Sequence, residues 1–132
     1  MNEIRPSELE VLLTHFSWNL QRLDEVLKQE KSDYFKSAAL QRFGNTYNIA
    51  LKTIQSYAQS KSIPCNIDEK CFETAVQNGW MKNQPEWKEI TADFQRINQK
   101  PQQNIERVYS KLATYHNALH YLFAQLKDLV EH

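Results

Sequence analysis

The side chains best suited to chemistry in this sequence lie in the polar segment 94–111. Its charges are almost all basic, because Arg96, Lys100, Arg107 and Lys111 stand against one acid, Glu106. Arginine and lysine match the oxygens of phosphate groups, so a basic break between two helices could hold phosphate. The alternative is a solvated turn between two helices, and the pattern taken alone favours this second interpretation.

The histidines form no recognisable catalytic or metal-binding motif. His116 and His120 are four residues apart and would be neighbours on one helix face, but no H-E-x-x-H pattern or suitably placed acidic third ligand accompanies them. His116 falls on an apolar stripe, which is typical of a core or interface histidine. The acid pairs 24–25 and 68–69 lie near expected helix ends, where capping or solvation explains them. No serine triad is indicated either. We therefore predict no catalytic residue, no metal and no cofactor.

The two cysteines, Cys65 and Cys71, are six residues apart with no histidine nearby. This spacing fits no standard zinc site and predicts two thiols in a reducing compartment. Residues 1–10 are charged and lack the apolar region of a secretory signal. No apolar run approaches the roughly 20 residues that span a bilayer. These observations favour a cytoplasmic protein that does not enter a membrane.

The composition restricts the fold class. The chain has 132 residues and only two glycines, and its 16 Lys and Arg balance 16 Asp and Glu. This length suits one domain, spanning residues 1–132, with a substantial core. So few glycines argue against a β-sandwich, a Rossmann fold or a P-loop. A net charge of zero gives no bulk attraction to nucleic acid or anionic lipid.

Hydrophobic periodicity predicts an all-α protein. Apolar residues recur every three or four positions, which places them on one face of a helix. Three long helices and two short ones are expected, with approximate ranges 7–30, 32–60, 67–78, 83–100 and 102–130. Because the connections are short, we predict an up-and-down antiparallel bundle of about five helices.

Local signals mark several helix ends. Pro6 and Ser7 suit the start of the first helix, and Asn66 with Glu69 three residues later forms a potential capping box for the third. The pair Asn78-Gly79 suits the end of that helix, and 83–85 the start of the next.

Three further residues carry expectations about packing. Gly44 lies inside the second helix and marks either close packing or a kink. Trp80 and Met81 follow the third helix and are expected to fold back onto the bundle.

The second helix also carries a resemblance to a known family. Leu40-Gln41-Arg42-Phe43, Thr46-Tyr47 and Ile49-Ala50-Leu51-Lys52 resemble the "RFE-x-T-[FY]-E-L-A-W-K" helix of the nucleotidyltransferase substrate-binding proteins, a branch of the HEPN superfamily. The similarity covers roughly residues 8–130. It continues through Phe72, Ala75, Asn78-Gly79-Trp80-Met81, Trp87, Ile90 and Val108-Tyr109.

The resemblance implies a five-helix HEPN bundle that forms a homodimer. Members commonly pair with a separately encoded minimal nucleotidyltransferase, often as a toxin–antitoxin couple. Many HEPN proteins are metal-independent ribonucleases that use an arginine, a polar residue and a histidine four to six positions after the arginine. In those enzymes the arginine stabilises phosphate charge and the histidine transfers a proton.

This chain departs from the family pattern where that motif would lie. Residues 96–103 occupy the place of the motif and contain no histidine. In a gapless alignment back from Tyr109, the arginine position falls on Asp93 and the histidine position on Asn98. The two family glutamates are replaced by Gly44 and Asn48. We therefore expect a catalytically silent module, because the general base is missing.

We accordingly expect nucleotide or partner contacts at Arg96, Asn98 and Lys100. Arg42 and Lys52 match the family helix and either add positive charge to a cleft or lie on a solvated face. The expected partner is a minimal nucleotidyltransferase, and the expected ligand a nucleotide or RNA.

Two alternatives remain open at this point. One is a divergent HEPN ribonuclease in which His116, His120 or a tyrosine transfers the proton. The other is a structural interaction protein that kept the bundle without the family's role.

Overall fold

The computed structural model describes residues 7–83 and 87–131, and within them it contains helices and no strand. The predicted all-α class is confirmed. None of the helices in these ranges is both long enough and apolar enough to cross a membrane. The helices are α1 (Glu8–Leu27), α2 (Asp33–Ser60), α3 (Asp68–Gln77), α4 (Trp87–Gln99), α5 (Pro101–Tyr109) and α6 (Leu112–Glu131).

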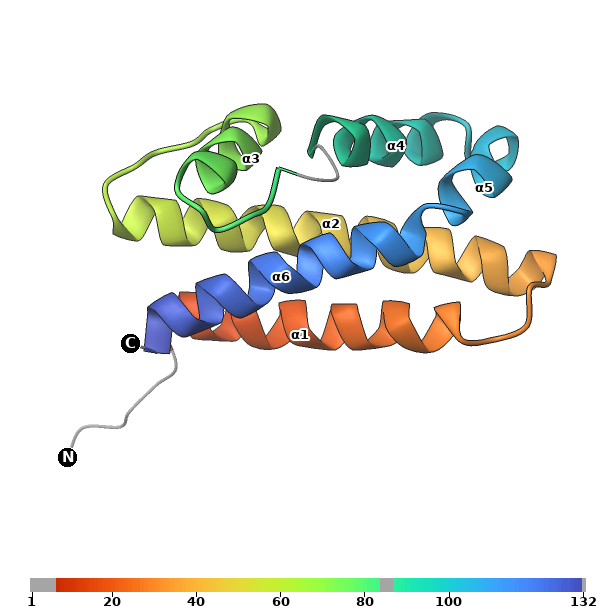
Figure 1. Cartoon of the computed structure of the whole chain (residues 1–132), viewed down its shortest axis with the longest axis horizontal. Helices are drawn as coiled ribbons and strands as arrows, with labels where there is room; N and C mark the ends of the chain where they lie inside the picture. The colour runs from red at the N-terminus through yellow and green to blue at the C-terminus, as the bar shows by residue number, and fades with distance from the viewer. Residues whose placement is uncertain (1–6, 84–86, 132) are drawn as a thin grey trace.

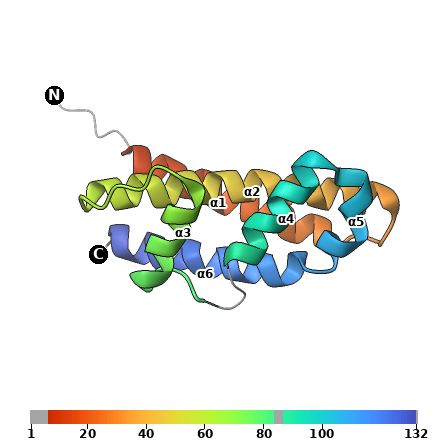
Figure 2. The same cartoon turned by 90° about the horizontal axis from the view of Figure 1, so that it is seen from above.

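The three long helices form the body of an up-and-down bundle. α1 contacts both α2 and α6 and runs antiparallel to them, and α2 also contacts α6 (Figure 1). The shorter helices α3, α4 and α5 lie together on the side of α2 opposite α1. Seen from above, α3 crosses the bundle axis and α4 runs obliquely to it (Figure 2). The side of the bundle that covers α2 is therefore made of three short helices and not of one long helix.

The described residues form six helices rather than the expected five, because the last expected helix is broken at Ser110 and Lys111. The Ser110 hydroxyl donates to the carbonyl of Arg107 at 2.9 Å, and the backbone N–H of Lys111 donates to the carbonyl of Val108 at 2.9 Å. These tight bonds end α5 and turn the chain into α6. The break redirects the chain from α5, which packs on α2, into α6, which also packs on α1.

The helix ends confirm some local predictions and correct one. The backbone N–H of Glu10 donates to Oγ of Ser7 at 3.1 Å, so Ser7 caps α1 as predicted. Gly79, with φ +76°, follows α3 and confirms the predicted stop. The predicted capping box at Asn66 is wrong, because α3 begins one residue later and Ile67 is its N-cap, without a side-chain hydrogen bond.

Two other predicted helix starts fall partly outside the described residues. Pro6 lies outside them, as do residues 84–86 at the expected start of the fourth helix. In the described part of the chain, α4 begins at Trp87.

The core lies between the long helices and is closed by α3 and α4. Trp80 and Met81 are buried, which confirms that they fold back onto the bundle. α2 continues unbroken through Gly44, and a Cβ added there would lie 3.8 Å from Cε1 of Phe94 on α4. Gly44 therefore lies where α2 faces α4 without interrupting α2, and close packing does not require a glycine there, because a Cβ would make only ordinary van der Waals contact.

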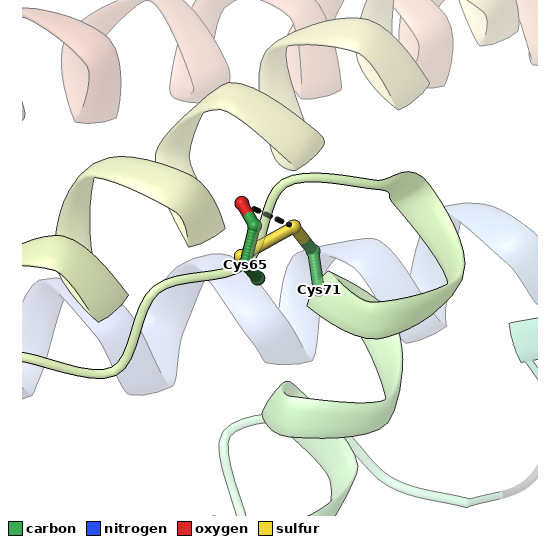
Figure 3. Close-up of a disulfide and its surroundings, with 2 residues drawn as sticks. All are labelled: Cys65 and Cys71. Atoms are coloured by element: carbon green, nitrogen blue, oxygen red, sulfur yellow. Dashed lines mark hydrogen bonds between the residues drawn. A yellow bond between two sulfur atoms is a disulfide. The ribbon is translucent and has the colours of Figure 1, made fainter.

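The expectation of two free thiols is wrong. Cys65 and Cys71 form a disulfide, with their Cα atoms 5.1 Å apart (Figure 3). The chain between α2 and α3 turns back on itself, which brings Cys65 beside the first turns of α3. Sγ of Cys71 also lies 3.4 Å from the carbonyl oxygen of Cys65. The pairing depends on the path of this connection, which the six-residue spacing does not specify.

Candidate functional site

A buried aspartate gathers most of the basic residues of segment 94–111. Asp93, on α4, is fully buried, and its Oδ1 lies 2.5 Å from Nη1 of Arg96. Its Oδ2 accepts a hydrogen bond from the Tyr115 hydroxyl at 2.5 Å and lies 3.6 Å from Nζ of Lys111. Nε of Arg107 lies 4.0 Å from Oδ1. We call these five residues the Asp93 cluster.

Three helices and one turn build this cluster. Asp93 and Arg96 are three residues apart on α4, so they share a face of that helix. Arg107 comes from α5, and Tyr115 from the first turn of α6. Lys111 lies in the break between α5 and α6, so the break itself delivers a cation to Asp93. The cluster therefore joins α4, α5 and α6 where they meet (Figure 1).

The contacts of the Asp93 cluster offset the free-energy cost of burying a carboxylate. An unpaired charge in a protein interior is strongly unfavourable, so a buried acid needs cations and hydrogen-bond donors. Asp93 has both, and Lys111 also pairs with Oε1 of Glu89 at 2.7 Å. Within the described part of the chain, every buried side-chain nitrogen and oxygen has a hydrogen-bond partner.

Tyr115 is held in its protonated form by its surroundings. Burial raises the pKa of Tyr115, and its hydrogen bond to the Asp93 carboxylate and the nearby Glu89 carboxylate raise this pKa further. The phenol therefore serves as a hydrogen-bond donor to Asp93 at neutral pH.

Tyr47 forms a second buried polar junction, on α2. Its hydroxyl oxygen lies 3.3 Å from Oδ2 of Asp68 on α3 and 3.2 Å from Oγ1 of Thr91 on α4. Burial raises the pKa of Tyr47 to about 12. The Tyr47 ring is also stacked on Phe94, with centroids 3.9 Å apart. This junction ties three helices together inside an aromatic cluster.

The five residues predicted to bind a nucleotide or partner do not come together. Arg96 belongs to the Asp93 cluster, whereas Asn98 lines a separate hollow of about 300 Å³ between α2 and α4. Lys100 is the exposed N-cap residue of α5. Arg42 and Lys52 line two different hollows between α1 and α2.

The described histidines have their contacts elsewhere in the bundle. Nε2 of His116 lies 3.0 Å from the carbonyl oxygen of Leu20, and its ring stacks on His120 with centroids 6.1 Å apart. His15 stacks on Trp18 with centroids 5.6 Å apart. In residues 7–83 and 87–131, no three His, Cys, Asp or Glu side chains are grouped so that they could hold a metal ion.

The role of Asp93 was not predicted from the sequence, where this residue was named only as the position aligned with the arginine of the family motif. A signal was available, because Asp93 interrupts the apolar stripe of α4 between Ile90 and Ile97, both buried. An acid at such a position needs a partner, and the downstream segment is basic. No comparable signal indicates the contact of Asp93 with Tyr115, because the two residues are 22 positions apart in the sequence.

Comparison with known proteins adds no family assignment. No family model matches this chain, and no curated protein matches it significantly.

Proposed function

We propose that the chain is a catalytically silent binding module whose Asp93 cluster contacts phosphate or an acidic partner surface. The observation that supports this is the gathering of three cations on one buried carboxylate while their own side chains stay partly exposed. Arg107 is 55% exposed, Arg96 36% and Lys111 33%. Asp93 thus fixes cations at the surface without covering them.

The charge of the site is suited to an anion. Three cations face two carboxylates, Asp93 and Glu89, which leaves one positive charge in excess. Arg107 is the most exposed of the three and is held only at 4.0 Å, so its guanidinium has N–H groups free to meet phosphate oxygens.

The resemblance to the substrate-binding partners of minimal nucleotidyltransferases gives this module a role. In that role the chain forms a homodimer and, as one half of a toxin–antitoxin-type pair, presents a nucleotide or RNA to the enzyme. A groove of about 590 Å³ between α1 and α6 supports the homodimer, because Leu13, Phe123 and Val130 line it beside Lys127 and Glu131. Apolar surface with both signs of charge suits contact between two copies of one face.

The alternative of a ribonuclease is less well supported by the geometry. It needs a group that exchanges a proton near neutral pH beside Arg96. The three described histidines have their contacts on α1 and α6, and burial raises the pKa of Tyr115. Both observations favour binding over proton transfer.

Capture of partners by the tagged full-length chain tests this proposal. Wild type should retain a minimal nucleotidyltransferase from its host, identified by mass spectrometry, and Arg107→Glu should reduce that capture at least about tenfold. Lys70→Glu is the matched control, because it reverses an exposed charge on α3, away from the cluster. Failure to capture a nucleotidyltransferase, or equal capture by both variants, would contradict the proposal.

A cytoplasmic location is part of the proposed role, and the disulfide provides its test. Disulfides usually persist in oxidising compartments, whereas cytosolic thiols are kept reduced. Trapping thiols with a maleimide reagent under denaturing lysis, which exposes the two buried cysteines, should label both Cys65 and Cys71 if the chain works in the cytoplasm. Complete protection of both residues would instead place it in an oxidising compartment.

A further inference from the structure

The hollow between α1 and α2 that Lys52 lines lies away from the Asp93 cluster. It has a volume of about 420 Å³. The residues that matter here are Trp18 and Arg22 on α1, and Asn45, Asn48 and Lys52 on α2, and we call this hollow the α1–α2 groove.

The helix spacing explains why these side chains meet. Trp18 and Arg22 are four residues apart, and the three α2 residues are separated by three and four, so each set shares one helix face. α1 and α2 lie side by side and antiparallel (Figures 1 and 2). Oγ1 of Thr46 lies 3.3 Å from the carbonyl oxygen of Asn19, which places the middle of each helix opposite the other.

The groove is basic because the two helices lack acids over most of their length. No Asp or Glu occurs between Val11 and Leu23, or between Tyr34 and Ser60. Among the residues that the structure describes, neither Arg22 nor Lys52 forms an ion pair. These cations differ from those of the Asp93 cluster, which already face carboxylates.

An aromatic ring lies beside the unpaired cations. Trp18 is 55% exposed, and its ring stacks on His15, which also lines the groove, with centroids 5.6 Å apart. Exposed aromatic rings give sequence-tolerant stacking platforms for bases, and nearby cations follow the phosphates. Asn45 and Asn48 add amide groups that can donate to and accept from a base edge.

We propose that the α1–α2 groove binds a nucleotide unit, with Trp18 stacked on the base and Arg22 and Lys52 on the phosphate. The amides of Asn45 and Asn48 meet the edge of the base. The chemistry recognised is a base carrying a phosphate, which a free nucleotide and a single-stranded nucleic acid both offer.

Binding measurements on the full chain test this site with two probes. The first is adenosine monophosphate, followed by NMR shifts of the Trp18 indole N–H, and the second is a fluorescein-labelled ten-nucleotide oligoadenylate RNA, followed by anisotropy at low salt. Binding of both probes identifies a nucleotide site, and binding of the RNA alone identifies the strand as the ligand. Failure of both probes to bind at millimolar concentration overturns the proposal.

Variants then assign the binding to the groove. Trp18→Ala should weaken it about tenfold, and the double variant Arg22→Ala/Lys52→Ala should weaken it further and flatten its salt dependence. Ile67→Ala and Lys70→Ala are the controls for an exposed apolar side chain and an exposed cation, and neither should matter. Unchanged binding in Trp18→Ala or in the double variant overturns the proposal.

Two further measurements separate this site from neighbouring features. Trp18→Ala should weaken nucleotide binding whether or not wild type captures a nucleotidyltransferase, so a failure of partner capture does not affect the groove. Trp18 also borders the groove between α1 and α6, so light scattering on Trp18→Ala is needed. If this variant loses only self-association and retains nucleotide binding, Trp18 belongs to a protein interface and the proposed site is wrong.

Discussion

Replacing Asp93 with asparagine removes the charge that holds the corner of α4, α5 and α6 together. The amide is nearly the same size as the carboxylate, so the change leaves no cavity. It leaves Arg96 and Lys111 without their buried counter-charge, and it turns an N–H₂ group toward one of the donors that now point at Asp93.

The size of the effect follows from burial. Breaking a fully buried ion pair costs about 3–5 kcal/mol. The cations around Asp93 are one-third to one-half exposed and can turn toward water, which reduces the loss. We therefore expect a loss of about 3 kcal/mol in the free energy of unfolding. For a chain of this length that corresponds to a fall in Tm of about 10 °C.

Urea unfolding followed by circular dichroism measures this loss, with Asp24→Asn as the matched control. Asp24 pairs with Lys28 on the surface of α1, so its replacement should leave the midpoint almost unchanged. Tyr115→Phe removes one donor to Asp93 and should cost about 2 kcal/mol. The double variant should cost less than the sum of the two, because the partners are in contact. An Asp93→Asn midpoint equal to that of Asp24→Asn would refute the role given to this aspartate.

Three further predictions concern stability. Gly44→Ala should raise the free energy of unfolding by about 0.5–1 kcal/mol, because a Cβ there makes ordinary contacts with Phe94. Gly79→Ala should lower it by about 1 kcal/mol, because the φ angle of Gly79 is +76°. The urea midpoints of both variants test this prediction. The raised pKa values of Tyr47 and Tyr115 predict stability that is complete below the unfolded tyrosine pKa, near 10, and that falls as the pH rises toward about 12. Tyrosinate absorbance at about pH 11 should therefore be lower in the native than in the urea-unfolded protein by the signal of about two tyrosines, and equal absorbance would contradict the burial of both hydroxyls. Reducing the Cys65–Cys71 disulfide should lower stability by about 2 kcal/mol, because it closes a short loop of the unfolded chain. A Cys65→Ser/Cys71→Ser variant, whose stability dithiothreitol should leave unchanged, is the control.

The parts of the fold that depend on nearby residues could be predicted from the sequence. Ser7 caps α1 through a residue three positions away, and Gly79 ends α3 through its own backbone angle. The break at Ser110 could not be predicted, because Val108 and Leu112 keep the helical spacing across it and are both buried. Periodicity reports the face that is buried and not the direction of the helix axis.

The candidate site was predicted only in part, for a related reason. The basic character of segment 94–111 is a local property, and Arg96 was identified from it. Asp93, which organises this segment, contacts Tyr115, a residue 22 positions later in the sequence. It also lies near Lys111, which is in the break between α5 and α6. The unpaired cations Arg22 and Lys52 come from different helices, so their proximity also depends on the tertiary fold.

The way α3 is attached has a consequence for hydrogen exchange. A helix of ten residues is too short to persist alone in water. Here it is held by a disulfide at Cys71, by the contact of Asp68 with Tyr47, and by the burial of Trp80 just beyond its end. Because Asp68 and Trp80 attach the two ends of α3 to Tyr47 and Tyr57 of α2, we expect α3 to open with the bundle and not as a separate unit. Its amide protons should therefore exchange only when the whole bundle unfolds, although α3 is one of the shortest helices in the described chain.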